Sequence, residues 1–191
     1  MTVITFKGSQ EILIQSILKT RILTNAFTDV HFKQLNLNCY DDIGDFTKMG
    51  PFSYNLTIYM IHCLSSQQKE LEKMGYSFYT FTKKDIIVIN GCYFFCINPD
   101  LIMQINKNKL LSFYKPPAAS LFSSPELQNK TSIPFKLTYK TIYYSIGILA
   151  IYCLTDLTDL TDLTELKNTK LYWFVLRCID KKEEERTLLL I

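Results

Sequence analysis

Hydrophobic periodicity divides the chain into a few strong helical segments, joined by stretches without a sustained period. Residues 10–23 (QEILIQSILKTRIL) place their apolar side chains on one face of a helix. Residues 53–74 predict a longer helix, with Gly75 as its C-terminal stop. Residues 139–154 are apolar on nearly all sides, which is typical of a buried helix. A last pair of helices is expected within residues 167–191.

The strongest β signal lies between the second and third of these helices. The β-branched run DIIVIN at 85–90 and the run CYFFCI at 92–97 meet at Asn90-Gly91, a dipeptide typical of two-residue hairpins. Residues 24–50 carry turn signals and no sustained period, so an irregular connection is expected there. The pattern therefore predicts an α+β fold that is predominantly α, with one small hairpin.

A strict three-residue repeat, LTDLTDLTDLTEL, occupies residues 154–166. An α-helix has about 3.6 residues per turn, so leucines at every third position drift around its surface and form no single stripe. We interpret the repeat as a tolerant surface segment that arose by slippage of a short coding repeat.

The uncharged run at residues 141–155 is shorter than the roughly 17–25 residues that a membrane-spanning helix needs. A buried core helix is expected there, and no membrane span. The first residues, MTVITFKGSQ, lack the layout of a signal peptide. Together with six cysteines that we expect to be mostly buried, reduced thiols, this favours a cytoplasmic location.

Composition and motifs exclude several functional classes. The net charge of +3 is small and the basic residues are scattered, so nucleic-acid binding is not predicted. Cys92 and Cys96 have no second pair that would complete a zinc site, and His62 is expected to pack in the core. The chain contains no G-x-S-x-G, H-E-x-x-H or P-loop motif.

Two short motifs lie around the loop that precedes the apolar helix. Ser124-Pro125-Glu126 closes the loop, and Tyr144-Ser145-Ile146-Gly147 lies within the helix. With the preceding helix and hairpin, their order resembles the C-terminal lobe of a eukaryotic-type protein kinase. In that family a catalytic loop H-R-D-x-x-x-x-N leads to D-F-G, and the activation segment ends at A-P-E.

The resemblance assigns positions to the catalytic residues, and this chain departs from the family at each of them. Thr80 stands where the catalytic Asp belongs, Asp85 where the metal-binding Asn belongs, and Asn98 where the D-F-G Asp belongs. No Gly-rich loop or β3 lysine precedes the helix at 10–23. The resemblance therefore implies no catalytic activity, no metal site, and no cofactor, with ATP and magnesium binding not expected.

The structural positions of the family are kept. Ser124, Pro125 and Glu126 match the A-P-E position, and Ser145 and Gly147 match the W-S-x-G core of the central helix. In the family an Arg near the end of the lobe pairs with the A-P-E Glu, and Arg186 is the candidate here. The alternative is that Glu126 and Arg186 are ordinary surface charges, with Glu126 stabilising a first helical turn.

The resemblance implies two regions: a remnant of the small lobe at 1–51, with Glu11 near the position of its ion-pairing Glu, and a kinase C-lobe-like domain at 52–191. Our leading hypothesis is a catalytically inactive, kinase-like domain that acts through protein–protein interaction, with partners and oligomeric state unassigned. One alternative is an atypical active Ser/Thr-type kinase completed by another chain. The other is an unrelated α-rich structural or membrane-associated protein. The richness in Ile, Lys, Asn, Tyr and Phe favours an A+T-rich source such as a large DNA virus, which would place the protein in the host cytoplasm.

Overall fold

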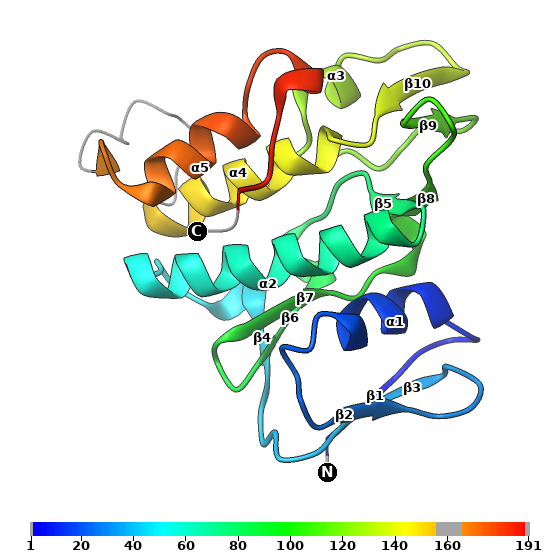
Figure 1. Ribbon diagram of the computed structural model, residues 1–191, viewed down its shortest axis with the longest axis vertical. Coiled ribbons are helices and arrows are strands. Elements are labelled where there is room, and N and C mark those ends of the chain that lie inside the picture. Colours follow the sequence, from blue (N-terminus) through cyan, green and yellow to red (C-terminus); the bar gives the residue numbers. More distant parts are fainter. Residues whose placement is uncertain (1, 156–165, 190–191) are drawn as a thin grey trace.

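The computed structural model describes residues 2–155 and 166–189, which form a mixed α/β fold (Figure 1). Helix makes up 39% and strand 20%, with small antiparallel sheets, so the prediction of a predominantly α fold is wrong. The strands that the sequence did not reveal are only three or four residues long. An alternating pattern needs about four to eight residues to be recognised, so segments this short carry too little signal.

The first part of the chain builds a small sheet with one helix. Strands β1 (Thr2–Thr5), β2 (Ala26–Thr28) and β3 (Gln34–Leu37) pair antiparallel in the order β1-β3-β2. Helix α1 (Glu11–Lys19) shares a buried apolar cluster with them. The cluster consists of Ile14, Ile17, Leu23, Leu35, Leu37, Ile89 and Phe95.

Helix α1 is shorter than the sequence predicted. It ends at Lys19, and Arg21 has a φ of 58°, in the left-handed region that stops an α-helix. Leu23, which the periodicity assigned to the helix, is still buried, but it reaches the core from the following turn.

The predicted hairpin is present. Strands β6 (Ile86–Ile89) and β7 (Tyr93–Cys96) pair antiparallel, and Asn90 and Gly91 between them have φ values of 49° and 69°. Two consecutive positive φ angles are the requirement of a type I′ turn, which explains the Asn-Gly sequence. Strand β4 (Ile43–Asp45) adds to β6, so the sheet has the order β4-β6-β7.

Two further two-stranded sheets were not predicted. Strand β5 (Tyr76–Phe78) pairs with β8 (Ile102–Gln104), and β9 (Leu110–Phe113) pairs with β10 (Phe135–Thr138), both antiparallel. Both sheets lie on the right of the view in Figure 1, near the end of α2 and the start of α4, and the pairing of β9 with β10 closes the long loop between them.

Three helices form the centre of the larger part of the molecule. Helix α2 (Tyr54–Lys73) begins at the N-cap Ser53, whose hydroxyl accepts the Leu56 N–H, and it contacts α1, β7 and α4. Helix α4 (Thr141–Thr155) is buried along most of its length, and α5 (Lys170–Cys178) packs against it. The helices predicted at 53–74 and 139–154 are therefore confirmed.

Of the helical pair predicted within 167–191, the described residues 167–189 contain one α-helix, α5. After α5 the chain forms a single 3-10 turn, η5 (Glu183–Glu185), and then an extended segment.

Within the described residues, no helix has the length and apolar character needed to cross a membrane. Most of the threonine–aspartate–leucine repeat, residues 156–165, lies outside the described residues. The proposed boundary at residue 51 falls between β4 and α2 and stays a prediction.

Candidate functional site

The position that the kinase resemblance assigns to a catalytic carboxylate lies in a cluster of hydroxyl groups. The Thr80 side chain is buried, and its Oγ1 lies 2.8 Å from Ser123 Oγ and 3.1 Å from Ser120 Oγ. Ser123 Oγ in turn accepts the backbone N–H of Ser120 at 2.8 Å. A threonine hydroxyl remains protonated near neutral pH, so this position supplies no general base and instead ties two segments together.

Asp85 uses both carboxylate oxygens in internal hydrogen bonds. It ends the 3-10 turn η2 (Lys83–Asp85), where Oδ2 accepts the backbone N–H and the hydroxyl of Thr82, each at 2.7 Å. The other oxygen, Oδ1, accepts the side-chain amide of Asn98 at 2.7 Å. The structure therefore brings Asp85 and Asn98 together, while Thr80 is held by serines from another loop.

Asn98 is also a capping residue. Its Oδ1 accepts the Asp100 N–H at 3.0 Å and starts the 3-10 turn η3 (Pro99–Leu101). Asp100 is exposed.

Burial, and to a lesser extent the negative charges of Asp100 and Asp85, raise the pKa of Tyr79. Within residues 2–155 and 166–189, no three His, Cys, Asp or Glu side chains gather closely enough to hold a metal ion.

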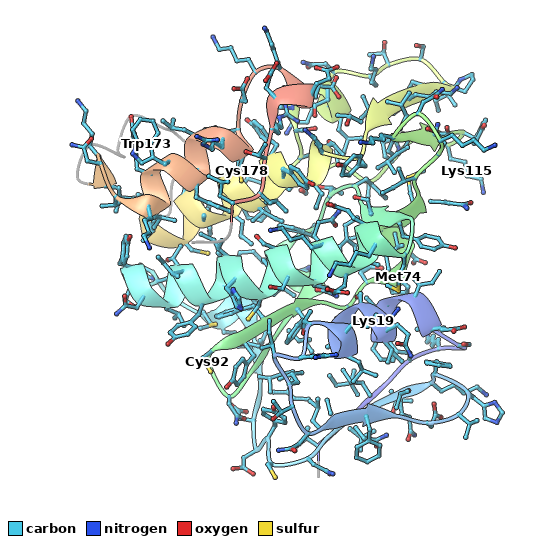
Figure 2. All side chains as sticks on the ribbon, in the orientation of Figure 1. Lys19, Met74, Cys92, Lys115, Trp173 and Cys178 are labelled. Atoms are coloured by element: carbon cyan, nitrogen blue, oxygen red, sulfur yellow. The ribbon has the colours of Figure 1, made fainter. Side chains whose placement is uncertain are left out.

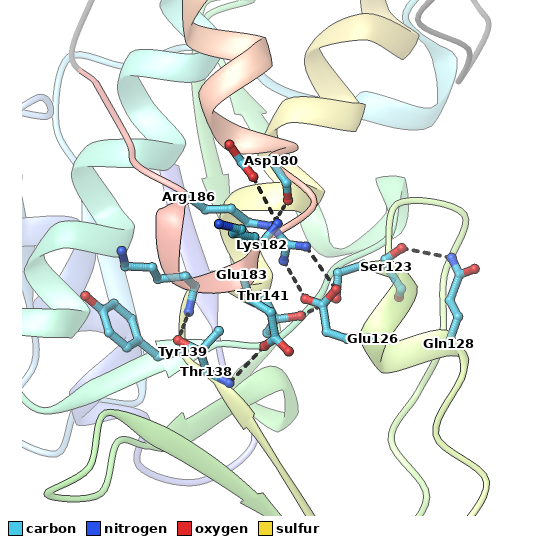
Figure 3. A network of polar contacts seen from close by, with 12 residues as sticks. Ser123, Glu126, Gln128, Thr138, Tyr139, Thr141, Asp180, Lys182, Glu183 and Arg186 are labelled. Carbon is cyan, nitrogen blue, oxygen red and sulfur yellow. Dashed lines mark hydrogen bonds and ion pairs between the residues drawn. The ribbon is translucent and has the colours of Figure 1, made fainter.

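A second polar network surrounds Glu126 (Figure 3). Helix α3 (Pro125–Gln128) starts after Ser124, with Pro125 in its first turn. It positions the Glu126 side chain against Arg186, which lies near the C-terminus. Arg186 donates to both carboxylate oxygens, from Nη1 to Oε1 and from Nη2 to Oε2, the latter at 3.0 Å. The contact expected between Glu126 and Arg186 is thus present, and it has bidentate geometry.

Arg186 is 1% exposed, and its Nε and the flat surface of its guanidinium also have partners. Nε donates to the Asp180 carbonyl at 2.9 Å, and the guanidinium carbon lies 5.1 Å from the centre of the Tyr144 ring. Beside the pair, the hydroxyls of Ser124 and Thr141 are hydrogen-bonded and link α3 to the start of α4. The network therefore joins α3, α4 and the segment after α5.

The ionisation of Glu126 reflects two opposing influences. Burial, the larger single influence, favours the neutral acid, but the hydrogen bonds from Arg186 and Ser124 together with the Arg186 charge favour the carboxylate. The net effect lowers the pKa of Glu126 below its ordinary value. Glu126 is therefore held as an anion, as an ion pair requires.

The two residues expected in the central helix differ in what they do. At Gly147, α4 lies very close to the end of α5, because a Cβ at this position would lie 2.8 Å from Cys178 Cβ and 2.9 Å from Ile179 Cγ2. Ser145 is buried, and its hydroxyl has no hydrogen-bond partner within the described part of the chain. The close approach explains the glycine, and the structure gives no polar role to the serine.

The structure also shows the positions of Glu11, His62 and the six cysteines. Glu11 opens α1, is exposed, and forms no ion pair with a described residue. His62 is exposed on α2, so its expected place in the core is wrong: the apolar half of α2 is not buried on every side. Four of the six cysteines are buried as expected, whereas Cys39 is exposed and Cys92 is half-buried.

Sequence reasoning missed a groove beside the hydroxyl cluster. It has a volume of about 480 Å³ and is lined by Thr47, Thr82, Lys83, Lys84, Ser120, Leu121, Phe122 and Tyr152. Lys83 Nζ lies 4.8 Å from the centre of the Tyr152 ring. The lining residues come from four distant parts of the chain, and no local pattern in the sequence connects them.

The comparisons with known proteins add no family. No protein-family model matches the chain, and no curated protein matches it.

Proposed function

We propose that this chain is a catalytically inactive, protein-kinase-like domain that works by binding other proteins. The observation that carries the proposal is the use of the three degenerate positions as structural links. Thr80 bonds to serines, and Asp85 and Asn98 bond to each other. A site for phosphoryl transfer needs free carboxylates that hold magnesium against the nucleotide phosphates.

The order and contacts of the elements support the kinase-like part of the proposal. Over residues 52–154 the chain forms a long helix, a hairpin, a loop region and a buried helix, in the order that the resemblance implies. The ion pair from Glu126 to Arg186 and the close approach at Gly147 occupy the positions implied for the family's structural residues.

Nucleotide-dependent stabilisation tests the proposal against the alternative of an active kinase. We expect the melting temperature of the wild-type chain to be unchanged by ATP or ADP, with or without magnesium. A nucleotide present at 100 times its Kd would stabilise the fold by about 2.7 kcal/mol, which thermal unfolding resolves easily. A magnesium-dependent rise in melting temperature would contradict the proposal.

Asp85→Asn separates a structural role from a metal-binding role at the same position. We expect this variant to unfold at a lower temperature than the wild type, by the same amount with and without magnesium and ATP, because an amide replaces the carboxylate acceptor of three hydrogen bonds. Asp100→Asn, at an exposed neighbouring acid, is the matched control. A loss of stability that appears only when magnesium and ATP are present would favour metal binding instead.

A further inference from the structure

Positive charge is concentrated in about one fifth of the chain, residues 101–140. Residues 101–140 contain six lysines and one acidic residue, Glu126, which is bound to Arg186. The excess of five positive charges (6 − 1) is larger than the net charge of +3 of the whole chain. The lysines are Lys107, Lys109, Lys115, Lys130, Lys136 and Lys140.

The register of β9 and β10 decides which of these side chains share a surface. Leu111 and Phe113 of β9 are buried, so the alternating residue Ser112 faces outward, and its partner across the sheet is Lys136. Tyr114, two residues after Ser112, is 75% exposed. The outer face of this two-stranded sheet therefore carries a lysine and an exposed aromatic ring.

Two shallow hollows meet at this face and share Ser112 and Tyr114. The first, about 330 Å³, lies toward β10 and is also lined by Pro134, Phe135 and Lys136. The second, about 490 Å³, lies toward the segment after β8 and is also lined by Gln104, Ile105, Asn106 and Lys107. Tyr114 thus stands between two hollows, with one lysine on each side.

The two lysines beside Tyr114 are accessible to a partner protein. Lys107 and Lys136 are exposed, and neither forms an ion pair with a described residue. By contrast, Lys140 donates to the Glu184 carbonyl. Lys109 and Lys140 line a third, separate hollow together with the acidic residue Glu184, so we leave them out of this face. We therefore define the lysine–tyrosine face as Lys107, Ser112, Tyr114 and Lys136. In Figure 2 neighbouring Lys115 lies at the upper right, where β9 and β10 are, while Lys19 lies lower in the view, on α1.

We propose that the lysine–tyrosine face binds an extended, acidic segment of a partner protein. In an extended chain, the side chains at positions i, i+2 and i+4 share one face and recur about every 6–7 Å, so acidic residues at i and i+4 can meet the two lysines while an apolar residue at i+2 packs on the aromatic ring between them. Nucleic acid fits less well, since residues 101–140 contain no arginine and the face offers a single exposed ring instead of a series for base stacking. The inference rests on the proposed binding role and names its partner class.

Fluorescence anisotropy with a labelled peptide that repeats Glu-Ser-Val-Ser, which places glutamate and valine in turn on one face of an extended chain, tests this proposal on the full chain. We expect saturable binding that weakens as salt is raised, because the attraction is between exposed charges. Lys107→Glu with Lys136→Glu should weaken binding by roughly tenfold or more. Tyr114→Ala, which changes no charge, should weaken it severalfold. Lys107→Gln with Lys136→Gln provides a milder pair in case the charge reversal perturbs folding.

The matched control is Lys7→Glu with Lys19→Glu, which makes the same change in charge at two exposed lysines in the N-terminal part of the chain. We expect this variant to bind the peptide with at most a small loss. An equal loss in both double variants would overturn the proposal, because attraction to net charge alone would then explain binding. Tighter binding to single-stranded polyuridine, or to phosphatidylcholine vesicles containing phosphatidylserine, would also overturn it. None of these outcomes depends on nucleotide binding, so this inference and the proposed function can fail separately.

Discussion

Arg186 is a buried charge in which each of the three guanidinium nitrogens donates a hydrogen bond. Its guanidinium is almost completely removed from solvent, and it contacts a carboxylate, a backbone carbonyl and an aromatic ring. Removing a charge from water is costly, and only an arrangement that satisfies all of its donors recovers that cost. At the scale of single residues, the network around Arg186 is therefore the place where substitution should have the largest effect.

A double-mutant cycle tests this network. Glu126→Ala and Arg186→Ala should each lower the free energy of unfolding by about 3–5 kcal/mol, because each leaves a buried charge without its partner. The double variant should lose much less than the sum, since neither charge remains. Urea unfolding of the three variants and the wild type measures the coupling. Additive effects would show that the two side chains do not stabilise each other.

Glu72 gives the opposite dependence on pH from a salt-bridged acid. Burial, the main cause, raises the pKa of Glu72, although its Oε1 accepts hydrogen bonds from Gln68 at 2.8 Å and from the Tyr143 hydroxyl at 2.9 Å. Since the folded-state pKa lies above the unfolded value, the folded state favours the protonated acid. The resulting stabilisation is complete below the unfolded pKa and is lost as pH rises through the folded pKa.

Glu72→Gln should remove this pH dependence. The amide keeps an oxygen for both donors and carries no charge, so we expect the variant to be more stable than the wild type at neutral pH. The difference should shrink below the ordinary pKa of a glutamate, where the wild-type side chain is also neutral. Thermal unfolding across this pH range measures it. A constant difference at every pH would contradict a raised pKa.

At the scale of elements, the crossing of α4 and α5 depends on one missing side chain. Gly147 lets the backbone of α4 approach Cys178 and Ile179 at a distance that no Cβ would allow. Glycine weakens a helix interior by about 1 kcal/mol relative to alanine, so its presence in the middle of α4 is explained by this packing.

Gly147→Ala should therefore destabilise the protein despite improving helix propensity. We expect a loss of about 1–3 kcal/mol from overpacking, because α5 would have to move outward. Gly50→Ala is the matched control: a Cβ there meets no atom within 4 Å, and no effect of this kind is expected. Chemical denaturation of both variants gives the comparison. Equal stability of Gly147→Ala and the wild type would show that the two helices can separate at little cost.

The elements differ in how far their sequences predict them. Helices α2 and α4 and the Asn90-Gly91 hairpin were predictable because each carries its own local signal, a long period or a turn dipeptide. Strands β1 and β10 were not, because each has four residues and pairs with a strand more than twenty residues away. The content of strand was therefore underestimated.

At the scale of the whole molecule, the candidate site was predicted only in part. The contact of Glu126 with Arg186 followed from a resemblance in the order of motifs, and the structure contains it. The hydroxyl cluster did not follow, because Thr80 and its partner Ser123 lie 43 residues apart and belong to no shared pattern. The lysine–tyrosine face was also missed, since scattered lysines become one surface only after β9 and β10 pair in a particular register.

The distance in sequence between Glu126 and Arg186 also has a consequence for how the protein is made. The two residues are 60 positions apart, and α4 and α5 are translated between them. At roughly 5–20 residues per second, a ribosome needs about 3–12 s to cover this interval. During those seconds α3 has been synthesised without the arginine that neutralises Glu126, so a nascent chain can complete this part of its fold only after α5 and Arg186 have been added.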